Sequence, residues 1–135
     1  AGTENILGSL NGVFYTDTNT SKPTFANHLL AANGASDITA LVNDSPLQQY
    51  EVRSNNAGAS AQADVGATAD IAYTAGDTSN FVSRCTLDDA TINVAVQQLK
   101  IIGVSRDPEN NDLTAANVVW RVIVNQSAFD DTSGV

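Results

Sequence analysis

The sequence predicts an all-β domain: a small β-barrel or sandwich with at most one short helix and an extended N-terminal arm. Two β-branched runs near the C-terminus are typical of paired strands, and turn signals recur at intervals of roughly ten residues. Sustained helical periodicity is absent. We expect residues 1–11 to form the arm, residues 12–129 the β domain and residues 130–135 a polar tail.

The central element is expected between Gln97 and Asn125, where two apolar runs, 99–104 and 117–125, flank a polar connector. These runs are predicted to pair as a long hairpin with a wide tip. Both faces of the second run are largely apolar, which predicts a central strand covered on both sides. Alternate residues of a strand share a face, so the predicted core residues are Val118, Trp120, Val122 and Val124.

The first half of the chain is expected to contain a short strand over 12–16 and a short helix over 23–32. Pro23 suits the first helical position, and Asn33-Gly34 is a good stop signal. Alternating residues on either side of the turn at 43–46 predict two strands, 37–43 and 47–54, that form a second hairpin.

Further strands are expected over 69–74 and 81–87. The segment 88–98 fits both a helix and a strand, and its β-branched residues favour the strand. Residues 1–11 have too little pattern for a stable element, and they are expected to be either a disordered terminus or an arm that orders against a partner.

Length and charge narrow the function classes. The chain has 135 residues, enough for one domain. Its formal net charge is −9, from 15 acidic and 6 basic residues, and no basic cluster occurs. A nucleic-acid partner would need phosphate-neutralising Lys and Arg, and an anionic membrane would need a basic surface. We therefore expect neither partner.

Residues that could carry chemistry are few. With one cysteine, Cys85, and one histidine, His28, the chain cannot form an internal disulfide or a His/Cys metal cluster. Cys85 is expected to be a small, buried, apolar residue. No nucleophile-elbow or phosphate-loop motif occurs.

Acidic residues offer the remaining candidates. The loop 107–112 offers oxygen ligands for calcium but lacks the glycine and distal glutamate of an EF-hand, so a solvated hairpin tip is expected. The acid pairs Asp88-Asp89 and Asp130-Asp131 are expected to be solvated rather than an acid–base pair. The sequence thus predicts no catalytic site, no metal and no cofactor.

Five stretches, taken in order and spacing, carry a family resemblance. They are Ala40–Pro46 running into Tyr50-Glu51-Val52; Ala63–Gly66 followed by Ala69-Asp70; Thr86-Leu87-Asp88 with Thr91-Ile92; Leu99–Asn110; and Arg121–Asn125. Together they resemble a family of small virion proteins of tailed bacteriophages, encoded among the head genes. The resemblance spans roughly residues 40–125, leaves residues 1–36 unmatched, and includes an Arg106–Asn110 loop that is longer and more acidic than the family pattern.

The resemblance implies a capsid decoration, or cement, protein. Such a protein is made in the host cytoplasm, resides on the outer capsid surface of the virion, and clamps neighbouring copies of the major capsid protein, usually as a homotrimer. It has no catalytic site and needs no cofactor. An outward-facing protein does not meet packaged DNA, which agrees with the net charge of −9.

Apolar residues of the N-terminal arm are the predicted capsid contacts, because they are too few to fold alone yet enough to anchor on a partner: Ile6, Leu7 and Leu10. The main alternative function is a receptor- or carbohydrate-binding module of a phage fibre or tail. Two further functions compete with it: a hydrolase using paired carboxylates, and a self-assembling major capsid or tail-tube protein.

Overall fold

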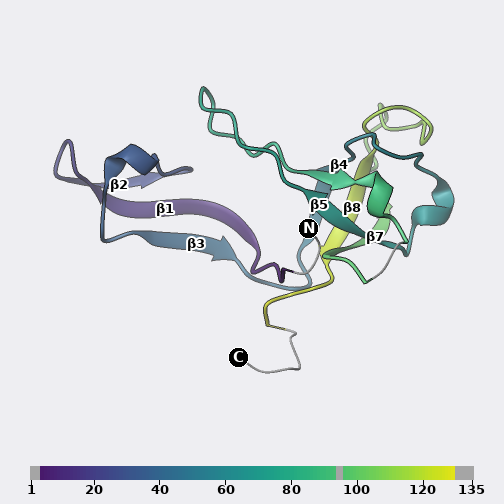
Figure 1. The fold of residues 1–135 in the computed structure, drawn as a ribbon, viewed down its shortest axis with the longest axis horizontal. Coiled ribbons are helices and arrows are strands. Elements are labelled where there is room, and N and C mark those ends of the chain that lie inside the picture. Colours follow the sequence, from purple (N-terminus) through teal and green to yellow (C-terminus); the bar gives the residue numbers. More distant parts are fainter. Residues whose placement is uncertain (1–3, 94–95, 130–135) are drawn as a thin grey trace.

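A computed structural model describes residues 4–93 and 96–129 of the chain. The fold is all-β, as predicted, and within the described residues the only helical elements are three single turns of 3-10 helix. The strands form two sheets, one of three strands and one of five, and the larger sheet curls into a half-barrel. The smaller sheet projects from it to one side (Figure 1).

The half-barrel contains the predicted hairpin. Its strand order is β4-β8-β7-β5-β6, with antiparallel neighbours throughout. The bounds are β4 Gln49–Arg53, β5 Thr68–Ala72, β6 Thr86–Asp88, β7 Leu99–Val104 and β8 Val119–Val124. Strands β7 and β8 pair from Leu99↔Val124 to Val104↔Trp120, with a bulge between Ile101 and Gly103. Strand β8 is internal, between β4 and β7, as its apolar composition predicts.

The core lies on the concave side of the half-barrel. Trp120 and Val122 have no exposed surface and Val118 is 2% exposed, whereas Val124 is half-buried. Leu87, Leu99, Ile101 and Ala69 complete the buried cluster. On the other side of β8, Val119, Arg121 and Ile123 are half-buried, so the strand is covered on both sides but unequally.

The edges of the half-barrel meet at one end only. There Ser54, just after β4, forms an isolated parallel bridge with Leu87 of β6. The Ser54 N–H donates to the Val118 carbonyl oxygen over 2.8 Å, and the Asn55 N–H donates to the Leu87 carbonyl oxygen over 2.8 Å. At the other end, the N-terminal segment lies beside the seam, since Ile6 bridges in parallel to Ser127.

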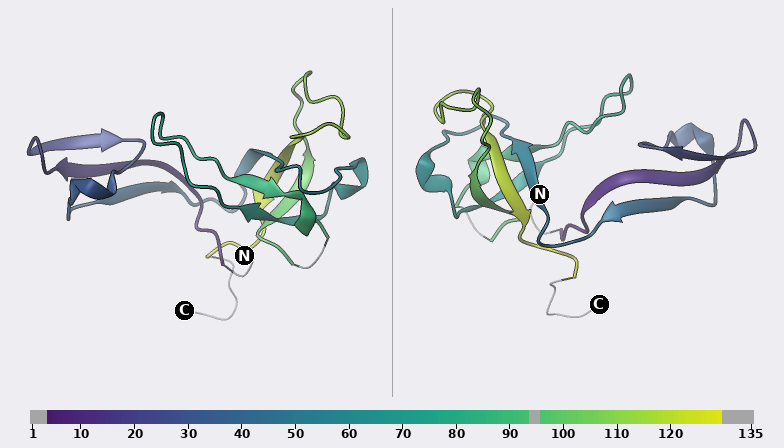
Figure 2. Two further views of the ribbon diagram at one scale, coloured as in Figure 1. Left: turned by 45° about the horizontal axis from the view of Figure 1, so that its top comes forward. Right: turned by 180° about the vertical axis from the view of Figure 1, so that it is seen from behind.

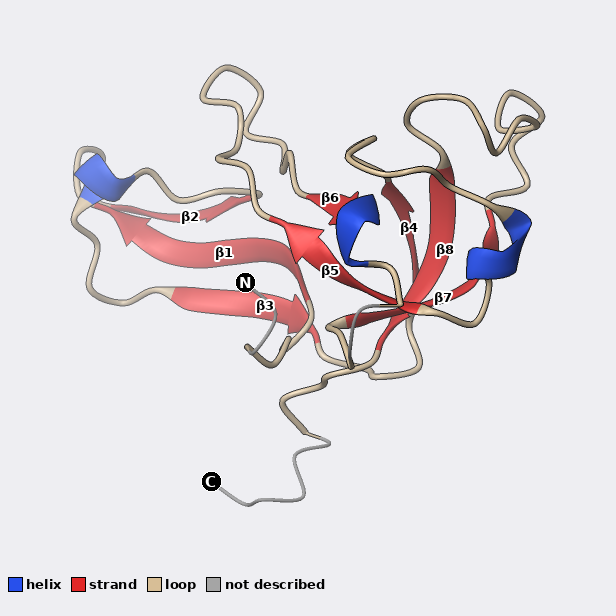
Figure 3. Cartoon of the chain, turned by 45° about the vertical axis from the view of Figure 1, so that its right-hand side comes forward, coloured by secondary structure: helices blue, strands red, loops and turns tan. Residues whose placement is uncertain are grey.

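The projecting sheet has the order β2-β1-β3, with β1 Ser9–Asp17 in the centre, β2 Lys22–Ala26 and β3 Thr39–Asn43. Two further views show it extending away from the half-barrel (Figure 2). The chain enters it at Ser9 and leaves it at Asn43, which are paired with each other. The 13-residue segment 73–85 between β5 and β6 also leaves the half-barrel and points toward this sheet (Figure 3).

The first half of the chain departs from the sequence prediction. Residues 23–32 do not form a helix: β2 occupies Lys22–Ala26, followed by a 3-10 turn, η1, over Ala31–Asn33. Because β2 is an edge strand, the missing N–H of Pro23 costs little there. The predicted hairpin over 37–54 is also wrong, because β3 pairs with β1 and β4 pairs with β8.

A physical reason explains that exchange of partners. Tyr50 and Val52 of β4 pair with Val122 and Trp120 of β8. Those two positions have no exposed surface. Antiparallel pairing there buries more apolar area than pairing with exposed β3 would.

Between β5 and β7, extended structure is shorter than predicted. Of the segment 81–87, only Thr86 and Leu87 belong to β6, because Phe81 has φ +57°, which no strand residue adopts. The predicted strand over 88–98 is wrong: after Asp88, which ends β6, a 3-10 turn, η3, occupies Asp89–Thr91, and Asn93 has φ +63°. Val96, one of the apolar residues of the pattern, is 71% exposed, so the pattern does not mark a buried strand face.

The described part of the predicted N-terminal arm, residues 4–11, is divided between two places. Residues 9–11 belong to β1, and Ile6 is held by an N–H donated to the Gln126 carbonyl oxygen over 2.8 Å. The sheet formed by residues 9–43 leaves the half-barrel, whereas Ile6 stays beside it. The predicted tail over 130–135 lies outside the described residues.

Candidate interaction interface

One side of the projecting sheet carries an exposed cluster of large apolar residues, which we call the apolar face: Phe14, Phe25 and Leu41. Directly paired residues of antiparallel strands project to the same side. Phe14 pairs with Phe25, and Gly12, on the same side as Phe14, pairs with Leu41. The exposed fractions are 48% for Phe14, 60% for Phe25 and 46% for Leu41. Three large apolar side chains therefore meet water together.

Gly12 shapes this face. A Cβ at Gly12 would lie 2.5 Å from the Phe25 ring, so the ring occupies the space that any larger residue's side chain would need. The glycine lets the aromatic ring lie against the backbone of β1. The sequence pattern gives no hint of this contact, because it places Phe25 in a helix.

The opposite side of the projecting sheet is covered. Val13 and Tyr15 alternate with Phe14 along β1 and are 5% and 7% exposed. Asn33, in the segment that returns beside the sheet, is buried, and its side-chain oxygen accepts a hydrogen bond from the Thr18 N–H over 3.5 Å. Val13 and Tyr15 are thus removed from water within one copy, whereas the apolar face is not.

Hydrogen bonds fix the outer end of the sheet. The Asp37 carboxylate accepts from the Thr16 N–H over 3.0 Å and from the Thr16 hydroxyl over 2.6 Å. The Thr16 hydroxyl, together with the N–H, lowers the pKa of Asp37. Asp17 accepts from the Asn19 N–H over 2.7 Å and so caps the turn into β2. These contacts hold the three strands as one unit.

The projecting sheet carries little charge. Residues 9–43 contain two acids, Asp17 and Asp37, and one base, Lys22, for a net charge of −1. The whole chain has −9, so the remaining −8 lies outside the sheet. Electrostatic repulsion between copies is therefore low at this sheet.

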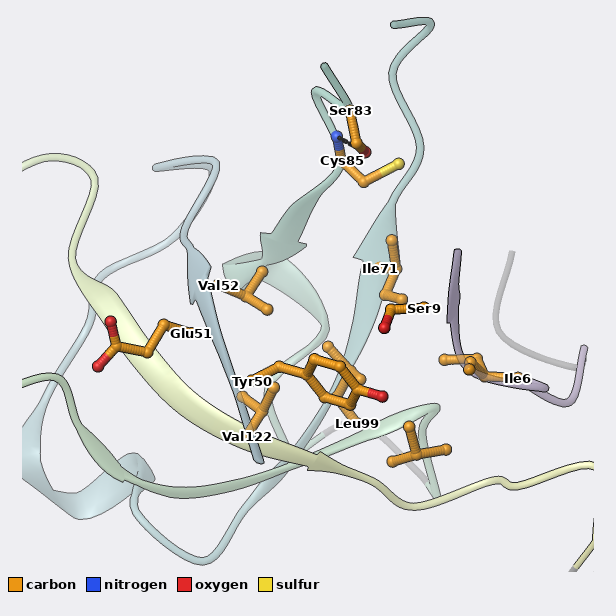
Figure 4. A pocket seen from close by; sticks show the side chains of 12 residues that line it. Ile6, Ser9, Tyr50, Glu51, Val52, Ile71, Ser83, Cys85, Leu99 and Val122 are labelled. Carbon is orange, nitrogen blue, oxygen red and sulfur yellow. Dashed lines mark hydrogen bonds between the residues drawn. The ribbon is translucent and has the colours of Figure 1, made fainter. Parts of the chain in front are cut away.

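An apolar cavity of about 270 Å³ lies at the open end of the half-barrel seam (Figure 4). Its apolar lining comes from β4, β5, β7, β8 and the N-terminal segment and includes Tyr50, Val52, Ile71, Leu99 and Ile6. Cys85, which directly precedes β6, also lines it and is half-buried. Glu51 is the one charged residue among the described lining. The cavity suits an apolar group that enters from outside.

A ring contact joins the projecting sheet to the loop 73–85. The imidazole of His28 and the ring of Phe81 stack with centroids 3.6 Å apart and planes 5° apart. Phe81 has positive φ, and its N–H donates to the Asp77 carbonyl oxygen over 2.8 Å, which closes a tight turn. The Ser79 hydroxyl and N–H lower the pKa of Asp77. His28 thus has a packing role.

The acid pair Asp88-Asp89 is part of the seam. Asp88 accepts from the Asn55 side-chain amide over 3.0 Å and from the Ala90 N–H over 3.2 Å. Asp89 is buried, and burial raises its pKa. The Ser54 hydroxyl and the Asn56 N–H lie near its carboxylate and favour the charged form, but neither reaches hydrogen-bond geometry.

The acidic tip loop binds its own backbone. Asp107 accepts from the Glu109 N–H over 3.0 Å, and Asp112 accepts from the Thr114 N–H over 2.9 Å and from the Thr114 hydroxyl over 2.6 Å. In the described part of the chain, no three His, Cys, Asp or Glu side chains gather as a metal site would require. The second acid pair, Asp130-Asp131, lies outside the described residues.

The predicted capsid contacts separate from one another. Ile6 is half-buried against the core and lines the cavity. Leu7 and Leu10 are 48% and 53% exposed and remain available to a partner. Leu10 pairs with Val42, on the opposite side of the projecting sheet from Phe14.

The comparisons with known proteins returned no match to a protein-family model, to a curated protein or to a solved structure. Among the described residues, no helix has the length and apolar character needed to cross a membrane. The fold and the surfaces therefore define the class: a small all-β protein with a projecting, half-uncovered sheet.

Proposed function

We propose that this protein is a capsid decoration, or cement, protein of a tailed bacteriophage. It binds the outer surface of the major capsid shell, stabilises that shell and acts as a homotrimer without catalysis. The observation that carries the proposal is the apolar face of the projecting sheet, because one side of the sheet is covered within the chain and the other exposes large apolar side chains. Such a face favours association with a protein partner.

Two further features support this proposal. Clustered exposed apolar residues mark sites of protein interaction, and here they lie on a sheet that extends from a body with its own core. The net charge of −9 keeps free copies apart and disfavours contact with packaged DNA. The resemblance to phage head proteins over residues 40–125 indicates that this partner is the capsid.

A binding assay tests the proposal. Purified protein is mixed with capsids that lack it, the capsids are sedimented, and bound protein is measured by gel and by cryo-electron microscopy. We expect saturable binding around local three-fold positions and a higher temperature of capsid disruption. Absence of the protein from sedimented capsids at saturating concentration would overturn the proposal.

Two variants locate the capsid contact. Leu7→Asp and Leu10→Asp place a charge on the exposed apolar residues near the N-terminus, so we expect each to weaken capsid binding at least tenfold, about 1.4 kcal/mol. Val82→Asp is the matched control, because Val82 is 56% exposed on the loop 73–85. Equal binding by all three variants would place the contact elsewhere.

A second candidate, a carbohydrate-binding module of a fibre or tail, is favoured by one observation. Phe14, Phe25 and Tyr73 expose aromatic rings, and Tyr73 is 82% exposed. Sugar rings stack on such side chains but also need convergent hydrogen-bonding groups, and the apolar face is poor in these. Binding of the protein to a glycan array, reduced by Tyr73→Ala, would favour this candidate over the capsid.

A further inference from the structure

We propose that copies of this protein associate head to tail, with Phe25 of one copy inserted into the apolar cavity of the next. The inference rests on the proposed function for the homotrimer, and it names the surfaces that form it. The two surfaces are the apolar face on the projecting sheet and the cavity at the half-barrel seam. Each lacks an occupant within the described part of the chain.

The cavity has the size and the lining for a phenyl ring. A cavity of about 150 Å³ lined by aliphatic side chains binds benzene, and this one measures about 270 Å³. Val52, Ile71 and Leu99 offer aliphatic contacts, and the ring of Tyr50 forms part of the wall (Figure 4). One phenyl ring fits, with space left for part of a neighbouring side chain.

Phe25 is the best placed side chain to enter it, once its ring turns away from Gly12, which it covers in the single copy. It is the most exposed member of the apolar face, at 60%, and it lies on β2, an edge strand of the projecting sheet. Phe14 and Leu41 stand behind it on the same face and would cover the cavity rim. From an area of about 200 Å² for one aromatic side chain, the three residues expose roughly 300 Å². That amount is a substantial apolar part of the roughly 800 Å² that one partner buries in a standard interface.

The chain cannot fill its own cavity with its own Phe25. Ser9 lines the cavity, and Phe14, the partner of Phe25, lies five positions further along β1. At about 3.3 Å per strand residue, this separation is roughly 15 Å. The sheet is hydrogen-bonded as one unit and points away from the half-barrel (Figure 2), so the occupant comes from a second copy.

Charge favours a second copy over an unrelated acidic surface. The projecting sheet carries a net −1 of the total −9, so it can approach another copy against little repulsion. The one charged residue in the described cavity lining, Glu51, is the cross-strand partner of Arg121. Two opposite charges therefore stand together there.

Two different surfaces in contact make a heterologous interface. Such interfaces generate closed rings when the rotation between copies closes. Three copies joined in this way form a homotrimer in which every projecting sheet and every cavity is occupied. Face-to-face packing of two apolar faces would instead form a two-fold dimer and leave both cavities empty.

The native cysteine provides the test. Cys85 is the only cysteine and lines the cavity, so a thiol introduced by Phe25→Cys would lie close to Cys85 of the next copy. The full-length Phe25→Cys protein is oxidised at high concentration, and the products are separated on a non-reducing gel. We expect dimers and trimers that disappear on reduction. Val82→Cys, at a 56% exposed loop position, is the matched control and should remain monomeric.

A second variant makes the outcome decisive. Phe25→Cys combined with Cys85→Ala should lose the crosslinked species, since the partner thiol is removed. Crosslinks that persist in this double variant would show that the apolar faces pack on each other, which would overturn the proposal. Monomeric product, with the thiols free or joined within one copy, would overturn it as well.

The two proposals fail separately. Crosslinking is measured without capsids, and capsid binding is measured with the unmodified chain. A Cys85-dependent ladder without capsid binding would remove the decoration function and leave the head-to-tail contact in place. Capsid binding without the ladder would remove the contact and leave the function.

Discussion

The side chain of Asn110 pairs with the backbone of Val119 as a neighbouring strand would. Its Nδ2 donates to the Val119 carbonyl oxygen over 2.9 Å, and its Oδ1 accepts from the Val119 N–H over 2.9 Å. Nδ2 also approaches the Ser105 carbonyl oxygen at 3.4 Å. One side chain therefore closes the wide tip of the β7–β8 hairpin where the strand ladder has ended.

Loss of this pairing should destabilise the fold. We expect Asn110→Ala to lower the unfolding free energy by about 1–3 kcal/mol, because the half-buried Val119 N–H loses its partner. Asn110→Asp should have an intermediate effect, since it can accept but not donate. Urea titration measures both, with exposed Asn111→Ala as the control. Equal midpoints for Asn110→Ala and Asn111→Ala would show that the contact is dispensable.

Trp120 is the largest fully buried side chain among the described residues. Trp120→Ala should lower the unfolding free energy by about 3–5 kcal/mol, through lost burial and the cavity left behind. Tyr73→Ala, at an 82% exposed position, should change it by less than about 0.5 kcal/mol. Denaturant titration followed by circular dichroism measures both. A loss below about 1 kcal/mol for Trp120→Ala would contradict the assigned core.

Gly8 lies where the chain passes into the projecting sheet. A Cβ there would lie 1.9 Å from the Asn43 carbonyl oxygen, so Gly8→Ala forces two backbone segments apart. We expect a loss of about 1–3 kcal/mol, typical of overpacking, with faster hydrogen exchange in β1 and β3. In Gly76→Ala the nearest backbone oxygen is 3.3 Å from the Cβ, so a smaller effect is expected. Unchanged exchange in β1 would exclude the predicted clash.

Asp89 and Asp37 should make the unfolding free energy depend on pH in opposite directions. Burial raises the pKa of Asp89 above the ordinary value of 3.8. Its contribution to the unfolding free energy is therefore fully present below pH 3.8 and is lost as the pH rises through the pKa of the folded state. The pKa of Asp37 is lowered, so its contribution is present above 3.8 and is lost as the pH falls through its folded pKa.

Urea titrations at several pH values separate the two groups. We expect the stability of the unmodified chain, relative to Asp89→Asn, to increase as the pH falls from 7 toward 4. Relative to Asp37→Asn, it should decrease below pH 4. A difference between Asp89→Asn and the unmodified chain that does not vary with pH would contradict the raised pKa.

Calcium should not stabilise the protein. Asp107 and Asp112 already accept hydrogen bonds from their own loop, and the Thr114 hydroxyl and N–H lower the pKa of Asp112. Differential scanning fluorimetry with millimolar calcium, and then with a chelator, should give the same midpoint as buffer alone. A midpoint that rises with calcium and falls with the chelator would overturn this expectation.

The fold class and the β7–β8 hairpin could be predicted because both strands are internal and buried. In Val119–Val124 every residue is buried or half-buried, so apolar residues follow one another in the sequence and identify the strand. The partner of β4 could not be predicted, because alternating Tyr50 and Val52 suit any apolar neighbour. Local patterns define a strand, while the pairing depends on how much area distant segments can bury.

The candidate interface was harder to predict. Phe25 belongs to the apolar face only because Pro23 lies on an edge strand and Gly12 lies beneath the ring. The spacing of Phe25 and Leu29 equally suits a helix, so local periodicity favours the wrong element. The cavity is formed by residues from the N-terminal segment, β4, β5, β7 and β8, and no short stretch of sequence contains its signal.

The pairing of Ser9 with Asn43 has a consequence for the modularity of the chain. Paired residues of antiparallel strands have Cα atoms about 5 Å apart, so the chain enters and leaves the projecting sheet at one place, between the N-terminal segment and β4. A short turn joining these two positions would bridge the gap and keep the N-terminal segment connected to β4. The sheet is therefore a cassette: it can be exchanged, lengthened or replaced by a foreign hairpin while the half-barrel keeps its own core.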